Sequence, residues 1–161
     1  MALAYIGCGA NLGERERQIK DALQRMSAFG IKVEKVSSFM ESAPYGPVDQ
    51  PDFINAVCLV STDLSPGELL AALKRIERDM DRLPAARWGP RNIDLDILLY
   101  DKIILDNGDL TIPHKDLLNR PFALLPLIQL AGEGFVHPVS GLSLKEHLAA
   151  LETREKYHST P

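Results

Sequence analysis

Hydrophobic residues recur along the chain at two different spacings, and these spacings predict its secondary structure. Four segments are apolar at alternate positions or throughout, as strands are, and two segments between them repeat apolar residues every three or four positions, as helices do. The predicted strands are Leu3–Cys8, Ile31–Met40, Phe53–Val60 and Ile93–Tyr100. The first predicted helix buries Ile19, Ala22, Leu23 and Met26, and the second buries Leu69, Leu73, Ile76 and Met80. The order of elements is therefore β-α-β-β-α-β.

Local signals indicate where several elements begin and end. The segment Gly9–Gly13 predicts a tight turn that leads into the first helix. Ser65–Glu68 predicts the start of the second helix, with serine as N-cap, proline at the first helical position and glutamate three residues after the cap. Lys102–Leu105 predicts a short hairpin partner of the last strand, and Ser143 with Glu146 predicts the start of a final helix.

This order of elements indicates an α+β fold with a ferredoxin-like core, in which two helices cover one face of an antiparallel sheet. Short helices punctuated by Pro121 and Pro126 follow, and they are expected to cover the other face in a three-layer α/β/α arrangement. We expect residues 1–161 to form a single domain. A chain of this length buries about two-thirds of its extended surface without help from a metal or disulfide.

Composition excludes several classes of function. The hydrophobic content of 45% and the charged content of 25% are those of an ordinary globular protein. A net charge of −4 argues against a general nucleic-acid binder. The absence of a long apolar run and of a basic leader predicts a cytoplasmic protein without a membrane partner, and nothing in the pattern argues for assembly beyond a monomer. Cys8 and Cys58 show no metal or redox spacing and are expected to be buried free thiols.

The most informative segment is Arg87–Asp96, where a cationic loop with one tryptophan runs into a strand that bears two carboxylates. Side chains alternate between the faces of a strand, so Asp94 and Asp96 are predicted to project together. On this pattern Leu98 and Tyr100 continue the same face, and the opposite face carries Ile93, Leu95, Ile97 and Leu99.

Two adjacent carboxylates repel each other unless cations lie between them. Arg82 and Arg91, in the loop beside this strand, bring positive charge without an acid between them and predict binding of an anion. Mg²⁺ held together with a polyphosphate satisfies both requirements, and two ions bridging Asp94 and Asp96 would clamp a triphosphate. A solvated strand face is the alternative for an isolated pair of this kind.

Two further groups of residues carry candidate chemistry. His114 and Arg120 form a second cluster of donors suited to phosphate, although a lone histidine is more often structural. Phe53 and Asn55 share a strand face, and with Phe122 they predict a site for a flat heterocycle that has hydrogen-bonding edges. The glycines from Gly7 onward do not match a dinucleotide-binding fingerprint, and no phosphate-binding Walker loop occurs.

Taken together, these motifs resemble those of the 6-hydroxymethyl-7,8-dihydropterin pyrophosphokinase family of folate biosynthesis, over nearly the whole chain. The resemblance implies a Mg²⁺-dependent reaction in which ATP transfers its β,γ-pyrophosphoryl group to the hydroxymethyl group of the pterin and AMP is released. The motifs that carry it are Tyr5–Gly7 with Gly9–Leu12, Gly46–Asn55, Arg87–Arg91 with Asp94–Asp96, and Pro113-His114 with Asn119-Arg120.

The resemblance also implies roles for single residues. Asp94 and Asp96 match the ligands of two magnesium ions, and with Arg82 and Arg91 they form the catalytic set. The positions that match ATP-binding residues are Glu77, Arg82, Trp88, Arg91, Ile97, Thr111, His114, Lys115 and Arg120. Those that match pterin-binding residues are Ser42, Ala43, Tyr45, Phe53, Asn55, Trp88, Asp94 and Phe122.

Two other functions stay open from the residues alone. A nucleotidyltransferase with a palm-like sheet also uses paired aspartates on a strand, and it would release pyrophosphate from ATP. A non-catalytic sensor of small molecules with a ferredoxin-like fold would account for the sheet and helices, but not for the aspartate pair beside the arginines.

Overall fold

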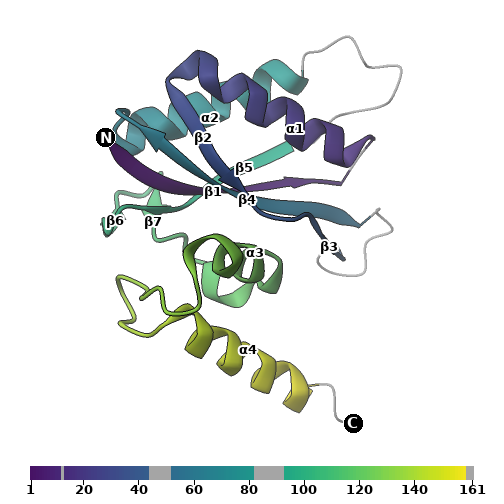
Figure 1. Cartoon of the computed structure of the whole chain (residues 1–161), viewed down its shortest axis with the longest axis vertical. Helices are drawn as coiled ribbons and strands as arrows, with labels where there is room; N and C mark the ends of the chain where they lie inside the picture. Colours follow the sequence, from purple (N-terminus) through teal and green to yellow (C-terminus); the bar gives the residue numbers. More distant parts are fainter. Residues whose placement is uncertain (12, 44–51, 82–92, 159–161) are drawn as a thin grey trace.

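Five antiparallel strands form the central sheet of the protein (Figure 1). The computed structural model describes residues 1–11, 13–43, 52–81 and 93–158. The strands are β1 (Ala2–Ala10), β2 (Ile31–Val36), β3 (Met40–Ser42), β4 (Phe53–Thr62) and β5 (Ile93–Tyr100). Their order is β2-β4-β1-β5, and β3 also pairs with β4. This order is the ferredoxin-like topology that the sequence predicts.

Helices lie on both faces of this sheet, as Figure 1 shows. The helices α1 (Arg15–Met26) and α2 (Pro66–Asp81) cover one face. The helix α3 (Pro121–Ala131) covers the other face, and α4 (Leu144–His158) packs against α3 and the 3₁₀ turn Leu117–Asn119. A second 3₁₀ turn spans Ser27–Phe29, and β6 (Leu105–Asp106) pairs with β7 (Thr111–Ile112) in a small separate sheet. The predicted three-layer arrangement is confirmed.

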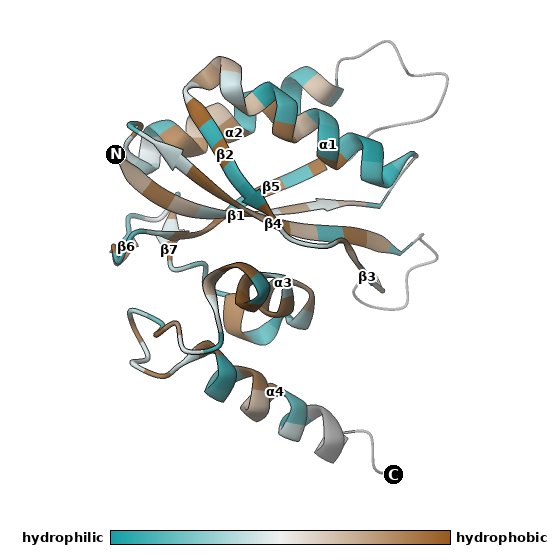
Figure 2. Cartoon of the chain, in the orientation of Figure 1, coloured by the Kyte–Doolittle hydropathy of each residue, from teal (hydrophilic) through white to brown (hydrophobic). Residues whose placement is uncertain are grey.

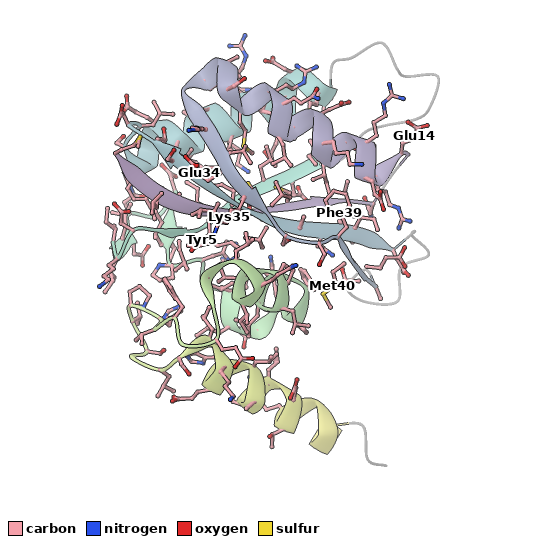
Figure 3. All side chains as sticks on the ribbon, viewed as in Figure 1. Tyr5, Glu14, Glu34, Lys35, Phe39 and Met40 are labelled. Atoms are coloured by element: carbon pink, nitrogen blue, oxygen red, sulfur yellow. The ribbon has the colours of Figure 1, made fainter. Side chains whose placement is uncertain are left out.

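The sheet has an apolar core on each of its faces, and Figure 2 shows hydrophobic residues along its strands and over most of α3. Ile6 and Cys8 face α1 and α2, whereas Leu98 faces α3. Tyr5 projects toward the α3 face, where its ring meets Phe135 edge-on at 6.2 Å between centroids (Figure 3). Because α3 lies between the sheet and α4, it is apolar nearly all round and not along one stripe.

A bulge in β5 overturns part of the predicted alternation. Tyr5 of β1 lies opposite Leu99, and the next residue of β1 lies opposite Ile97, so Leu98 has no partner of its own. The extra residue shifts the alternation by one position. Leu99 therefore packs on the α3 side and Tyr100 on the α1 and α2 side, contrary to the prediction for both residues.

The predicted strand Ile31–Met40 is divided into β2 and β3. Residues 37–39 face only two residues of β4, so one residue is in excess and the strand breaks. Ser37 bridges the gap: its backbone N–H donates to the carbonyl oxygen of Val57 and its hydroxyl oxygen accepts the Val57 N–H, each at 2.9 Å. Ser38 turns away and donates its N–H to the Gln129 side chain in α3 at 2.9 Å.

Two other boundaries differ from the prediction. Strand β1 continues through Gly9 to Ala10 in place of a turn, because β4 and β5 both continue beside it. Lys102–Leu105 does not pair with β5. Asp101 instead makes two hydrogen bonds with the backbone of Leu3, and the chain then leaves the sheet.

Several local predictions are confirmed. Ser65 and Glu68 form a reciprocal capping box, with N–H to side-chain oxygen distances of 3.0 and 3.2 Å. Ser143 caps α4 by accepting the Glu146 N–H at 3.1 Å. Cys8 and Cys58 are buried free thiols. Within the described residues, no helix combines the length and the apolar character that a bilayer span requires.

The loop between α3 and α4 depends on a neutral histidine. The Nδ1 atom of His137 accepts the backbone N–H groups of Val139 and Ser140 at 3.2 and 3.3 Å. Burial, and next the nearby His147, lower the pKa of His137. The folded protein therefore binds fewer protons here than the unfolded chain, and stability falls as the pH drops below the ordinary histidine value of about 6.5.

We predict that the free energy of unfolding of the wild type decreases more between pH 7.5 and 5.5 than that of His137→Asn, whose amide oxygen accepts N–H groups without titrating. Urea unfolding at both pH values measures the difference. Burial lowers the pKa of His114 as well. His114 is present in both proteins, so its contribution to the pH dependence of stability cancels in the comparison. An equal loss in the two proteins would contradict the prediction.

Candidate active site

A cavity of about 200 Å³ opens on the α3 side of the sheet. Its walls come from β1, β3, β4 and β5 and from the segment that leads into α3. Residues predicted for three different roles meet there: Ser42, Ala43, Phe53, Asn55, Asp94, Asp96, His114, Arg120 and Phe122. The structure thus brings together residues that are far apart in the sequence.

Two glycines form the floor of this cavity. In the sheet register, Gly9 lies between Asp94 of β5 and Asn55 of β4, and Gly7 lies opposite Asp96. The strand spacing places Asp94 and Asn55 roughly 10 Å apart. A Cβ atom on Gly9 would lie 3.2 Å from Oδ1 of Asn55, so only glycine leaves this space open.

The sequence pattern predicts a turn at Gly9, so the role of these glycines was not predicted. A usable signal is present: Gly7 and Gly9 are two residues apart inside an otherwise apolar strand, and glycine within a strand often marks a close approach to a ligand or backbone.

The two carboxylates lie side by side at the start of β5, on the same face as predicted. Asp94 is exposed and Asp96 is half-buried. Partial removal of solvent, followed by the negative charge of Asp96, raises the pKa of Asp94. The site therefore bears an electrostatic cost that a cation would relieve.

Asp94 and Asp96 fit Mg²⁺ if other ligands complete its coordination. The described residues contain no cluster of three or more His, Cys, Asp or Glu side chains placed to hold a metal ion. Mg²⁺ commonly uses one or two protein carboxylates and completes its octahedron with phosphate oxygens and water. Asp94 and Asp96 match this coordination, and a bound phosphate would have to supply further ligands.

The amide of Asn55 has a defined orientation. Its Nδ2 atom donates to the Met40 carbonyl at 3.3 Å and to Ser42 Oγ at 2.8 Å. A carbonyl oxygen only accepts, so Nδ2 must be the atom that faces Met40. The amide oxygen is then the atom beside Gly9, over the floor of the cavity.

His114 and Arg120 add donors to the lining of the cavity. Nδ1 of His114 accepts the Asp116 N–H at 3.1 Å, so a neutral His114 carries its proton on Nε2. Burial lowers the pKa of His114, while the negative charge of Asp96 opposes this effect. Arg120 pairs with Asp116 at 3.3 Å, and its guanidinium carbon lies 5.9 Å from the centroid of the Phe122 ring.

Four residues predicted to bind ATP do not line the cavity. Ile97 is buried on the opposite face of the sheet, and Lys115 is exposed. Thr111 donates its hydroxyl to Asp106 at 3.3 Å. Glu77 accepts the Leu95 N–H at 2.9 Å. Four further predictions fall outside the described residues: Tyr45, Arg82, Trp88 and Arg91.

Comparison with known proteins decides the family. Residues 5–132 match the family described as 7,8-dihydro-6-hydroxymethylpterin-pyrophosphokinase (HPPK). The chain belongs to the HPPK family. The resemblance stated from the motifs is thereby confirmed.

Individual relatives differ in length. The chain is 46% identical over 134 residues to the 2-amino-4-hydroxy-6-hydroxymethyldihydropteridine pyrophosphokinase of Haemophilus influenzae, covering 83% of this chain and 84% of the relative. It is 47% identical over 143 residues to the folic acid synthesis protein fol1 of Pneumocystis carinii, covering 89% of this chain but 19% of that protein. This HPPK chain thus spans about a fifth of one relative and most of the other.

A solved structure supports the fold. Wild-type HPPK-DHPS of Plasmodium falciparum superposes with a TM-score of 0.75 at 16% identity, over 98% of this chain and 46% of that one.

The repulsion at the aspartate pair predicts a gain in stability when one charge is removed. Because the pKa of Asp94 is raised in the folded protein, its ionised form destabilises the fold at neutral pH, where the effect is fully present. We expect Asp94→Asn to raise Tm by about 1–3 °C in EDTA at pH 7.5. Calorimetry measures this change, and a lower Tm in EDTA would count against the electrostatic account.

Proposed function

We propose that this protein transfers the β,γ-pyrophosphoryl group of ATP to the hydroxymethyl group of 6-hydroxymethyl-7,8-dihydropterin in folate biosynthesis, with release of AMP. One observation carries the proposal. Asp94, Gly9 and Asn55 form a single row across three strands, so a paired-carboxylate site and a heterocycle site share one wall of the cavity. Neither a sensor of small molecules nor a nucleotidyltransferase with a palm-like sheet requires this combination of sites.

The acceptor occupies the cavity. A volume of about 200 Å³ lies below the range usual for drug-sized ligands and suits one flat ring system. Phe53 and Phe122 supply aromatic faces for stacking, and the Asn55 oxygen accepts a hydrogen bond from an N–H group at the ring edge. Ser42 and Ala43 border the same space.

ATP binds beside the cavity, because its triphosphate does not fit with the pterin in the same volume. His114 and Arg120 line the same cavity as the aspartates and neutralise phosphate oxygens. The family resemblance also assigns Arg82, Trp88 and Arg91 to this site, together with Lys115, Thr111 and Ile97.

Asp94 and Asp96 would hold two Mg²⁺ ions, which would supply charge neutralisation along the triphosphate. The protein's own residues then have little covalent chemistry to perform. Transfer requires the hydroxymethyl oxygen in line with the β-phosphorus, so Asn55 and the aromatic rings orient the acceptor while the arginines and His114 orient the donor. Among the described residues we assign no general base to the hydroxyl group.

Product analysis tests the proposed reaction. The protein is incubated with ATP, Mg²⁺ and the reduced hydroxymethylpterin, and the nucleotide product is identified. AMP formed together with a pterin diphosphate supports pyrophosphoryl transfer. ADP indicates transfer of a single phosphoryl group, free pyrophosphate indicates a nucleotidyltransferase, and no turnover indicates a sensor; each of these results contradicts the proposal.

Asp96→Ala should fold normally and yet lose most AMP formation. We expect a decrease of about 10²–10³-fold in kcat, the range seen when one group that stabilises transition-state charge is removed. Asp63→Ala is the matched control, because Asp63 is exposed and distant from the cavity lining. Full activity of Asp96→Ala would refute the assignment of this carboxylate to the metals.

Gly9→Ala should weaken pterin binding without loss of fold. The added methyl group would crowd Asn55 Oδ1 at 3.2 Å. A free-energy cost of overpacking of about 1–3 kcal/mol corresponds to roughly a 5–150-fold increase in the Kd of the pterin. Titration by pterin fluorescence measures Kd. Gly67→Ala is the control, since its Cβ meets no atom within 4 Å, and unchanged affinity in Gly9→Ala would contradict the role of the floor.

A further inference from the structure

Glu77 makes an unusual contact with the strand that bears the aspartates. β5 is at the edge of the sheet, and every second residue of an edge strand turns its N–H outward, where no neighbouring strand accepts it. Leu95, which stands between Asp94 and Asp96, is such a residue. The Oε2 atom of Glu77 accepts the Leu95 N–H at 2.9 Å.

This carboxylate is withdrawn from solvent and paired. The Glu77 side chain is 14% exposed, and Lys74 lies one helical turn earlier with its Nζ atom 3.0 Å from Oε1. Burial raises the pKa of Glu77, whereas the Leu95 N–H and Lys74 oppose the shift. A carboxylate at such a position is costly without partners, and here one oxygen is bonded to the strand and the other to a lysine.

The contact is placed where it can set the geometry of the site. Groups that support metal ligands usually fix their orientation and are nearly as important as the ligands themselves. A hydrogen bond to the residue between two ligands restrains the backbone of both. It also connects α2, which is anchored in the core by Ile76 and Met80, to the start of β5.

Direct contact with the nucleotide is the competing role. Both oxygens of Glu77 already have partners in the protein. A carboxylate beside a triphosphate would also be repelled. We propose that Glu77 is a positioning residue that acts through the Leu95 N–H on Asp94 and Asp96, and not by touching ATP. This inference rests on the proposed function.

Amide hydrogen exchange tests the contact without any substrate. Glu77→Met keeps the length of the side chain but removes the acceptor, and we expect the Leu95 amide to exchange at least about tenfold faster, because an edge N–H without a partner opens to water. Glu77→Gln keeps an acceptor oxygen and should retain most protection. Glu77→Ala repeats the comparison should the methionine variant not fold.

Asp79→Ala is the matched control. Asp79 lies on the same helix and pairs with Arg75 at 3.0 Å on the surface, so its loss removes an acid from α2 without touching β5. Unchanged Leu95 exchange in Glu77→Met would overturn the proposal.

Kinetics then separates positioning from nucleotide contact. In Glu77→Met we expect kcat to fall by about 10–100-fold and the half-saturating Mg²⁺ concentration to rise, with KM for ATP nearly unchanged and with recovery in Glu77→Gln. A rise in KM for ATP alone would overturn the proposal in favour of direct contact. If the wild type forms no AMP, the proposed function fails, and the exchange experiment alone decides whether Glu77 holds β5.

Discussion

The register of β1 between β4 and β5 determines the site. Gly9 lies between Asn55 and Asp94 only in this pairing. The burial of Ile6 and Cys8 against α1 and α2 specifies the register, because a shift of one residue would turn these side chains toward the cavity and the glycines toward the core. Packing on one face of the sheet thus keeps the other face open for a ligand. The core and the site are two consequences of one strand alignment.

The site also combines charges that the folded protein does not neutralise by itself. Asp94 and Asp96 share an edge strand, and the pKa of Asp94 is raised because partial removal of solvent and the negative charge of Asp96 both disfavour its ionised form. His114 and Arg120 line the same cavity as the two acids. The arrangement suits the proposed cation next to a polyphosphate, and its electrostatic cost to the folded protein is the usual trade between stability and activity.

Periodicity predicted the elements well and failed at the bulges for a physical reason. Both faces of this sheet are buried, so an apolar residue such as Leu99 is accommodated on either side, and the hydrophobic pattern does not register an extra residue in the strand. Ser37 breaks the predicted strand by using its side chain as an acceptor, which no hydrophobic spacing records. The capping box of Ser65 and Glu68 and the cap at Ser143 were predicted correctly because their partners are three residues apart. Gly9 was assigned to a turn because the strands that extend beside it, β4 and β5, are distant in the sequence.

By itself, the sequence determined what depends on neighbouring residues: the helices and strands, the shared face of Asp94 and Asp96, and the motifs that identify the family. Tertiary structure alone decided which residues meet. It placed Asn55 across Gly9 from Asp94, turned the amide oxygen toward the cavity, and brought Glu77 to the Leu95 N–H. The contacts behind these placements join residues that are 13 or more positions apart. They follow from strand pairing, bulges and helix packing, which no local pattern encodes.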